Sequence, residues 1–234
     1  MDRSNITFDV SRERLVNYAL QVEGASLTVD GNLSVATGDM TARSIKDRYL
    51  VVDMNTRDNI SWGKYNQPFS TMQMERIWQK VQSYLRAIKV FGMRYQAGVN
   101  PCYALEVTAI TEFAWHQLYL QNMLINDTAE SYADHAKWTL VSLPNMKLDP
   151  EVDDVHSESA VFIDITNKRI ILCGLRFPGE MKKALFSVQS YLLPVRGVLP
   201  MHCAVTKARS DATTLVLGVP ATGKTTLSSA TSRS

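Results

Sequence analysis

The sequence lacks several features that define whole classes of protein. It has no run of about 18 apolar residues, and its first residues, MDRSNITFDV, hold no apolar stretch of signal-peptide length, which argues against a transmembrane helix and a secretory signal. No charge sign dominates, because 25 Lys and Arg face 23 Asp and Glu, a net of +2. A nucleic acid or a membrane is therefore not the expected partner, although a local basic pocket is compatible with this balance.

Paired cysteines are also missing. Cys102, Cys173 and Cys203 are odd in number, widely spaced and without a C-x-x-C motif. This pattern predicts reduced, buried thiols in a cytoplasmic protein rather than a disulfide framework or a metal site.

What is present is the composition of a packed globular protein, with 45% hydrophobic and 21% charged residues. β-like and helical segments follow each other without strict alternation, which predicts an α+β fold, a mixed sheet with helices, for about the first 200 residues. The strands that we expect are residues 49–53, 89–98 and 138–144, and a hairpin made of 160–165 and 169–175.

Three helices are expected from cap residues and apolar spacing. Ser70 and Gln73 have the spacing of a capping box, and apolar residues then recur at helical intervals. Thr111 is predicted to cap a second helix, and a third is predicted from about Met181 to Tyr191, closed by Pro194. The inner face of the second helix would carry Ala114, Trp115, Leu118 and Tyr119.

The last segment of the chain holds a phosphate-loop motif. Gly218, Gly223, Lys224 and Thr225 fit G-x-x-x-x-G-K-[ST], after an apolar segment, TTLVLG, that we expect to be a buried strand. In such a loop the glycines let backbone N–H groups face phosphate oxygens, the lysine reaches the terminal phosphates and the hydroxyl binds Mg²⁺. A nucleotide site is therefore favoured over an accidental Gly-Lys turn.

The loop lacks the partners that it usually has. No Asp or Glu follows Asp211, whereas a phosphate-bound metal usually also needs a carboxylate from a neighbouring strand. We therefore expect the front of a longer protein. Residues 1–198 would form the α+β domain, and 199–234 would begin a mononucleotide-binding α/β domain.

Six segments in one order carry a resemblance to a known family. They are TARSIKDRYLV (41–51), AGVNP (97–101), ITEFAWHQLYLQNMLI (110–125), HSESAVFIDI (156–165), GEMKKALFSVQSYLLPVRGVLPMHCAV (179–205) and TGKTTLS (222–228). Together they resemble segments of the ATP-dependent phosphoenolpyruvate carboxykinases. The resemblance implies conversion of oxaloacetate and ATP to phosphoenolpyruvate, CO₂ and ADP in gluconeogenesis, with Mg²⁺ on the nucleotide and a second metal, typically Mn²⁺.

The resemblance also implies roles for particular residues on the substrate side. Arg43 would hold the substrate carboxylate, Lys182 would be an active-site lysine, and Lys183 and His202 would bind the metal. A guanidinium can hold a carboxylate by two parallel hydrogen bonds, and an imidazole is an ordinary metal ligand. Lysine ligates only as a neutral amine, which a helix N-terminus and a neighbouring lysine favour. Alone, each residue would read as a surface charge or a core histidine.

In the phosphate loop, the resemblance implies contacts to ATP phosphates from Thr222, Gly223, Lys224, Thr225 and Thr226. The motif itself adds Gly218 to the nucleotide-binding residues and assigns the hydroxyl of Thr225 to Mg²⁺.

Several residues depart from the family pattern. Phe177 stands where the family has a tyrosine that would contact substrate, and Pro178 replaces a glycine beside it. Further departures are Ala42, Thr108, Pro220 and Ala221. Phe177, Thr108 and Pro220 favour, as an alternative, a catalytically inactive relative that acts as a nucleotide-binding or scaffold protein. A third candidate, a different phosphotransferase such as the HPr kinase class, fits the upstream segments poorly.

Overall fold

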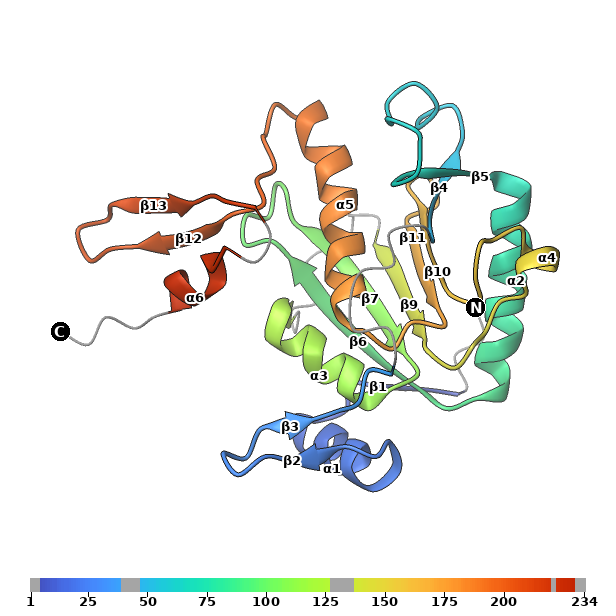
Figure 1. Ribbon diagram of the computed structural model, residues 1–234, viewed down its shortest axis with the longest axis horizontal. Helices are drawn as coiled ribbons and strands as arrows, with labels where there is room; N and C mark the ends of the chain where they lie inside the picture. The colour runs from blue at the N-terminus through green and yellow to red at the C-terminus, as the bar shows by residue number, and fades with distance from the viewer. Residues whose placement is uncertain (1–4, 39–46, 127–136, 220–221, 230–234) are drawn as a thin grey trace. The chain divides into compact units, whose positions relative to one another are not determined.

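A computed structural model describes residues 5–38, 47–126, 137–219 and 222–229 of the chain. The chain forms two compact units, Met1–Tyr191 and Leu192–Ser234 (Figure 1). None of the described helices is long and apolar enough to cross a bilayer.

The first unit is built on a mixed sheet of nine described strands. They are β1 (Ile6–Phe8), β4 (Arg48–Val52), β5 (Gln67–Ser70), β6 (Val90–Ala97), β7 (Leu105–Thr111), β8 (Ile125–Asn126), β9 (Trp138–Leu143), β10 (Ala160–Asp164) and β11 (Arg169–Cys173). Their order is β1-β6-β7-β9-β11-β10-β4-β5, with β8 beside β6. Five neighbouring pairs are parallel and three antiparallel, so the expected mixed sheet is confirmed. The strands expected at 49–53, 89–98 and 138–144 and the 160–175 hairpin are confirmed as well.

Helices cover both faces of this sheet (Figure 1). One face packs on α2 (Thr71–Ala87), whose buried residues are Met74, Ile77, Val81 and Leu85. Neighbouring strand residues point to opposite faces. Val90 packs in the cluster of α2, and Phe91 packs in the cluster of α1 (Arg12–Val22) and α3 (Ala114–Met123). Helices α1 and α3 therefore lie on the face opposite α2.

The predicted caps have different outcomes. The capping box of Ser70 and Gln73 is confirmed at the start of α2. The cap at Thr111 is wrong, because this residue ends β7 and its hydroxyl donates to the carbonyl of Phe113 at 2.8 Å. The carboxylate of Glu23 caps α3 instead, accepting from the backbone N–H groups of Ala114 and Trp115 at 2.6 and 3.3 Å.

Helix α5 (Gly179–Val195) is longer than the sequence pattern predicted, and Pro194 lies inside its last turn. A proline this close to the end removes one N–H, and the helix stops one residue later. The helix crosses the sheet, because Ser187 contacts Arg48 of β4 and Gln189 donates to the carbonyl of Ala97 in β6. The remaining elements of the first unit are a hairpin of β2 (Ser26–Leu27) and β3 (Leu33–Ser34), and the short α4 (Pro150–Asp153).

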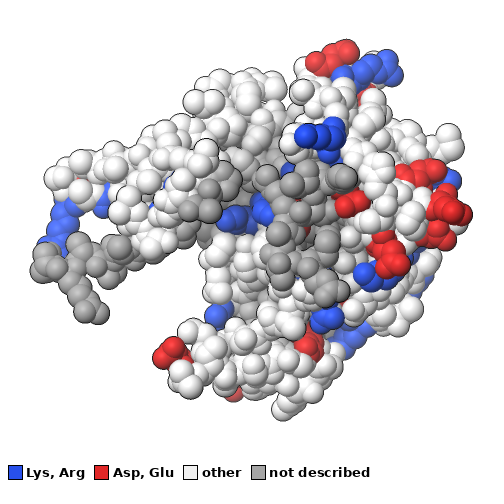
Figure 2. All heavy atoms as spheres, in the orientation of Figure 1, with Lys and Arg blue, Asp and Glu red and all other residues white. Residues whose placement is uncertain are grey.

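Charges of both signs lie on the face that Figure 2 shows, where Lys and Arg side chains are interspersed with Asp and Glu.

The second unit contains a two-stranded antiparallel sheet of β12 (Ala204–Lys207) and β13 (Thr213–Val216), followed by α6 (Lys224–Ser229). The strand before the loop is confirmed, but its burial is not, because Thr213, Thr214 and Leu215 are exposed. The reason is that, among the described strands, β12 and β13 pair only with each other. A two-stranded ribbon leaves its side chains in contact with solvent.

Candidate active site

The phosphate-loop residues lie between β13 and the first turn of α6, which begins at Lys224. Gly223 has a φ of +83°, a backbone conformation that favours glycine. A Cβ on Gly218 would stand 2.7 Å from the hydroxyl oxygen of Thr222, so this glycine allows the tight return of the loop. The loop is therefore shaped by its two glycines, as the motif requires. Pro220 and Ala221 lie outside the described residues.

The loop lysine turns back over the loop. The Nζ of Lys224 donates to the carbonyls of Gly218 and Val219, both at 2.8 Å, and Thr222 donates to the carbonyl of Val219 at 2.8 Å. Thr225 and Thr226 are in the first turn of α6, where Thr226 is exposed and the side chain of Thr225 is not described. An amine held over a curled backbone at a helix start is typical of nucleotide-phosphate sites.

The two predicted lysines are the fourth and fifth residues of α5, in the first unit. Lys182 is exposed, whereas the side chain of Lys183 is only 27% exposed. The Nζ of Lys183 donates to Oε1 of Glu180 at 2.7 Å and lies 5.2 Å from the centre of the Phe177 ring. The amine is thus held between a carboxylate and an aromatic face.

Glu180 is a functional candidate that our reading of the sequence missed. Its side chain is 1% exposed, and its Oε2 lies 3.5 Å from Nη2 of Arg48. Nη1 of Arg48 donates to the hydroxyl of Ser187 at 2.6 Å. A glutamate three residues before Lys183 was a readable signal, because residues at this spacing meet on a helix. No local sequence pattern predicts that Arg48 contacts Glu180.

The turn before α5 is fixed by a buried histidine, His116 of α3. Its Nε2 lies 3.0 Å from the carbonyl oxygen of Arg176, and its Nδ1 lies 3.1 Å from the hydroxyl of Ser142. A carbonyl can only accept, so Nε2 carries the proton and Nδ1 accepts from the serine. Burial, aided by the nearby Arg176 charge, lowers the pKa of His116 to about 4. His116 is therefore a neutral structural residue.

The other predicted residues are placed differently. Arg43 lies outside the described residues. His202 is exposed and precedes β12 in the second unit, whereas Lys183 belongs to the first. The convergence of Arg43, Lys183, His202 and the loop on one cation stays a prediction.

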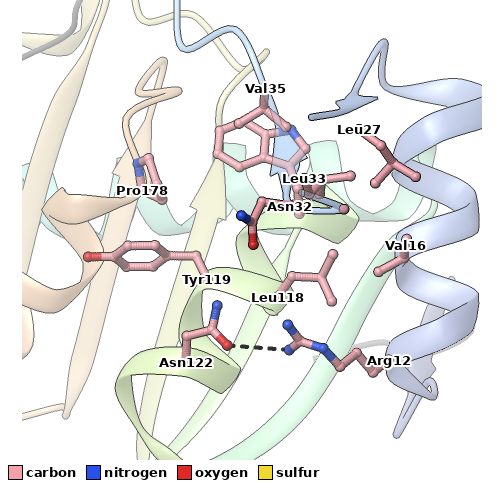
Figure 3. A pocket seen from close by; sticks show the side chains of 12 residues that line it. Arg12, Val16, Leu27, Asn32, Leu33, Val35, Leu118, Tyr119, Asn122 and Pro178 are labelled. Carbon is pink, nitrogen blue, oxygen red and sulfur yellow. Dashed lines mark hydrogen bonds between the residues drawn. The ribbon is translucent and has the colours of Figure 1, made fainter. Parts of the chain in front are cut away.

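A cavity of about 400 Å³ lies elsewhere in the first unit, between α1, the β2–β3 hairpin and α3 (Figure 3). Its walls are mainly apolar, and Arg12 is the charged residue that lines it, donating to Asn122 at 3.4 Å. None of the described site residues contributes to this cavity. Pro178, which precedes α5, also lines this cavity.

Comparisons with known proteins agree with the nucleotide-binding class of protein that the phosphate loop indicates. The family model described as phosphoenolpyruvate carboxykinase matches residues 4–234. The chain is similar to the phosphoenolpyruvate carboxykinase (ATP) of Geobacillus thermodenitrificans (strain NG80-2), with 37% identity over 230 residues. It is also similar to the protein of that name from Shouchella clausii (strain KSM-K16), with 41% identity over 223 residues.

The alignments cover 97% and 94% of this chain, but 44% and 42% of those two relatives. The chain thus spans less than half the length of the curated relatives that it matches. It belongs to the phosphoenolpyruvate carboxykinase family, as the six ordered segments predicted.

Proposed function

We propose that the chain is part of an ATP-dependent phosphoenolpyruvate carboxykinase, which decarboxylates oxaloacetate and transfers the terminal phosphoryl group of ATP to give phosphoenolpyruvate, CO₂ and ADP. The observation that carries the proposal is the loop of Gly218, Gly223 and Lys224 between β13 and α6, in a chain of this family. A place in gluconeogenesis and a cytoplasmic location belong to the same proposal and rest on the family resemblance.

The proposed domain boundary lies seven residues after the division between the two compact units, Met1–Tyr191 and Leu192–Ser234. Residues 1–198 would form the substrate-side domain and 199–234 would begin the nucleotide-binding domain. Lys182 and Lys183 lie in the first segment and the phosphate loop lies in the second, which supports this division.

On the substrate side, the chain supplies positive groups for a dicarboxylate. Arg43 would bind a substrate carboxylate through two parallel hydrogen bonds. Lys182, exposed on the first turn of α5, would neutralise negative charge on the substrate, at a helix end that itself attracts anions. On the nucleotide side, Lys224 would exchange its carbonyl partners for phosphate oxygens, while Gly218 and Gly223 keep the backbone open to them.

The chain offers side chains for the two metal ions that the family implies. The hydroxyl of Thr225 would hold Mg²⁺ with the nucleotide. Lys183 and His202 would offer an amine and an imidazole to the second metal, although Mn²⁺ prefers oxygen ligands, which these two residues do not supply. When bound, the metal ions supply positive charge that stabilises the enolate left by CO₂ and the phosphoryl group in transfer. Lys183 must lose a proton to act as a ligand, and the neutral amine can then offer its lone pair to the metal while an N–H still donates to Glu180.

One observation favours a second function. Phe177 places an aromatic ring beside Lys183 but has no hydroxyl to offer a substrate. If that hydroxyl is essential, the protein binds nucleotide without turnover. The alternative is therefore a catalytically inactive carboxykinase-like nucleotide-binding protein.

The test is phosphoenolpyruvate formation from oxaloacetate, ATP and Mn²⁺ by the longest natural reading frame, together with ATP binding by calorimetry. We expect turnover, and a loss on the order of 100-fold in kcat for Lys224→Ala, as for removal of one charge-stabilising donor. Lys207→Ala is the matched control, because Lys207 is an exposed lysine of the same unit that pairs only with exposed Asp211 among the described groups.

The outcomes separate the two functions. ATP binding without product would support the inactive relative and reject the enzyme. If Lys224→Ala binds ATP as tightly as the unmodified protein, both proposed functions are rejected, because both require this loop to bind the phosphates of ATP.

A further inference from the structure

A buried ionic contact joins β4 to the start of α5, close to Lys183, the proposed metal ligand. Arg48 is the first residue of β4, and Glu180 is the second residue of α5. Their side chains lie 3.5 Å apart between Nη2 and Oε2.

Glu180 is shared by two cations. Its Oε1 accepts a hydrogen bond from Lys183 at 2.7 Å, and its Oε2 faces Arg48. The side chain of Glu180 is 1% exposed, and those of Arg48 and Lys183 are 14% and 27% exposed. A carboxylate this deeply buried is costly unless it is paired, so its position is determined by both partners.

Arg48 contacts α5 at two positions along the helix. While Nη2 faces Glu180 on the first turn, Nη1 donates to the hydroxyl of Ser187, two turns further along, at 2.6 Å. Ser187 in turn donates to the backbone carbonyl of Lys183 at 3.0 Å. The planar guanidinium spans these two partners with fixed geometry, which a lysine could not reproduce.

We propose that Glu180 and Arg48 are positioning residues: Arg48 fixes the buried carboxylate of Glu180, and that carboxylate holds the Lys183 amine in place. The bridge thereby sets the position of the metal-binding lysine relative to β4. This inference rests on the proposed function for Lys183, but the bridge itself is testable without it.

The first test is site-resolved amine labelling of the protein in its longest natural reading frame. With an acetylating reagent and mass spectrometry, Glu180→Gln is expected to raise the labelling rate of Lys183 about tenfold, the factor expected for one hydrogen bond between charged groups. Exposed Lys182, the next residue along the helix, is the internal control and should not change. An unchanged Lys183 rate in a folded Glu180→Gln protein would overturn the positioning role.

The matched control variant is Asp153→Asn. Asp153 of α4 is another buried carboxylate, and it pairs with Lys80 of α2. The Asp153→Asn variant should leave the labelling rate of Lys183 unchanged. That result would show that the loss of an unrelated buried ion pair does not raise this rate. A rise equal to that in Glu180→Gln would assign the effect to general loosening and overturn the proposal.

The second test covers the role of Arg48 and also serves if Glu180→Gln does not fold. Arg48→Met leaves Lys183 beside Glu180, but the carboxylate of Glu180 is then no longer fixed on β4. We expect a rise of about tenfold in the Mn²⁺ concentration that gives half-maximal phosphoenolpyruvate formation, with little change in kcat, again the factor for one charged hydrogen bond. An unchanged Mn²⁺ requirement would overturn the positioning role of Arg48. If the unmodified protein makes no phosphoenolpyruvate, the proposed function fails, while the labelling of Lys183 still decides the bridge.

Discussion

The buried histidine beside the candidate active site predicts how stability depends on pH. His116 donates through Nε2 to the carbonyl of Arg176 and accepts through Nδ1 from Ser142, both inside the first unit. Protonation would place a second donor opposite the serine and a charge in a buried site next to Arg176. The fold therefore strongly favours the neutral ring.

The size of the effect follows from the two pKa values. Burial holds the pKa of His116 at about 4 in the folded protein, against about 6.5 for an exposed histidine. Because the folded pKa is lowered, the stabilisation is complete above about pH 6.5 and is lost as the pH falls toward 4. Between pH 7 and pH 5 the loss amounts to about 2 kcal/mol, roughly a factor of 30 in the unfolding equilibrium.

The assay is chemical denaturation of the chain at pH 7, 6 and 5, compared with His116→Gln. The variant keeps a neutral donor and acceptor at this position and retains the other histidines, so only the pH dependence of His116 should disappear. We expect the free energy of unfolding of the unmodified chain to fall about 2 kcal/mol more than that of the variant. Parallel curves would refute the reasoning, as would an NMR titration in which the His116 ring protonates above pH 6.

Two further substitutions test the packing around the site. Gly174→Ala is expected to destabilise the chain by about 1–3 kcal/mol in a denaturant titration, because φ is +69° and a Cβ would lie 2.7 Å from the backbone oxygen of Glu158; an unchanged midpoint would contradict it. Phe177→Tyr should restore a hydroxyl beside Lys183 and lower the KM for oxaloacetate about twofold to tenfold, the range of one hydrogen bond, with an unchanged melting temperature as the control. No change in KM would mean that the hydroxyl does not reach the substrate.

Features of the fold that depend on neighbouring residues could be predicted from the sequence. The capping box of Ser70 and Gln73 lies within one helical turn, and the 160–175 hairpin needs only a short turn between two apolar runs. The predicted cap of α3 was wrong because the carboxylate that caps this helix belongs to Glu23, which is far away along the chain. The predicted burial of β13 was wrong for a similar reason, since the burial of a strand depends on neighbouring strands that a local pattern does not specify.

In the candidate site, too, the features that depend on neighbouring residues could be predicted, and those that depend on distant residues could not. The spacing of Gly218, Gly223 and Lys224 predicted a loop between a strand and a helix, because the motif contains its own backbone requirements. The partners of Lys183 could be predicted only in part. Glu180 lies on the same helix turn, but Arg48 reaches that turn from a strand on the sheet, and no spacing in the sequence announces it.

The first turn of α5 is positioned by side chains from several parts of the first unit. His116 of α3 holds the carbonyl of Arg176, and Arg48 of β4 holds Glu180. The Phe177 ring packs so closely on Gly179 that a Cβ there would stand 2.5 Å from it. The helix start therefore cannot move without breaking a buried hydrogen bond, an ion pair or a packed ring. Because these contacts act on the backbone or on Glu180, changes at positions remote from any substrate should still displace the Lys183 amine.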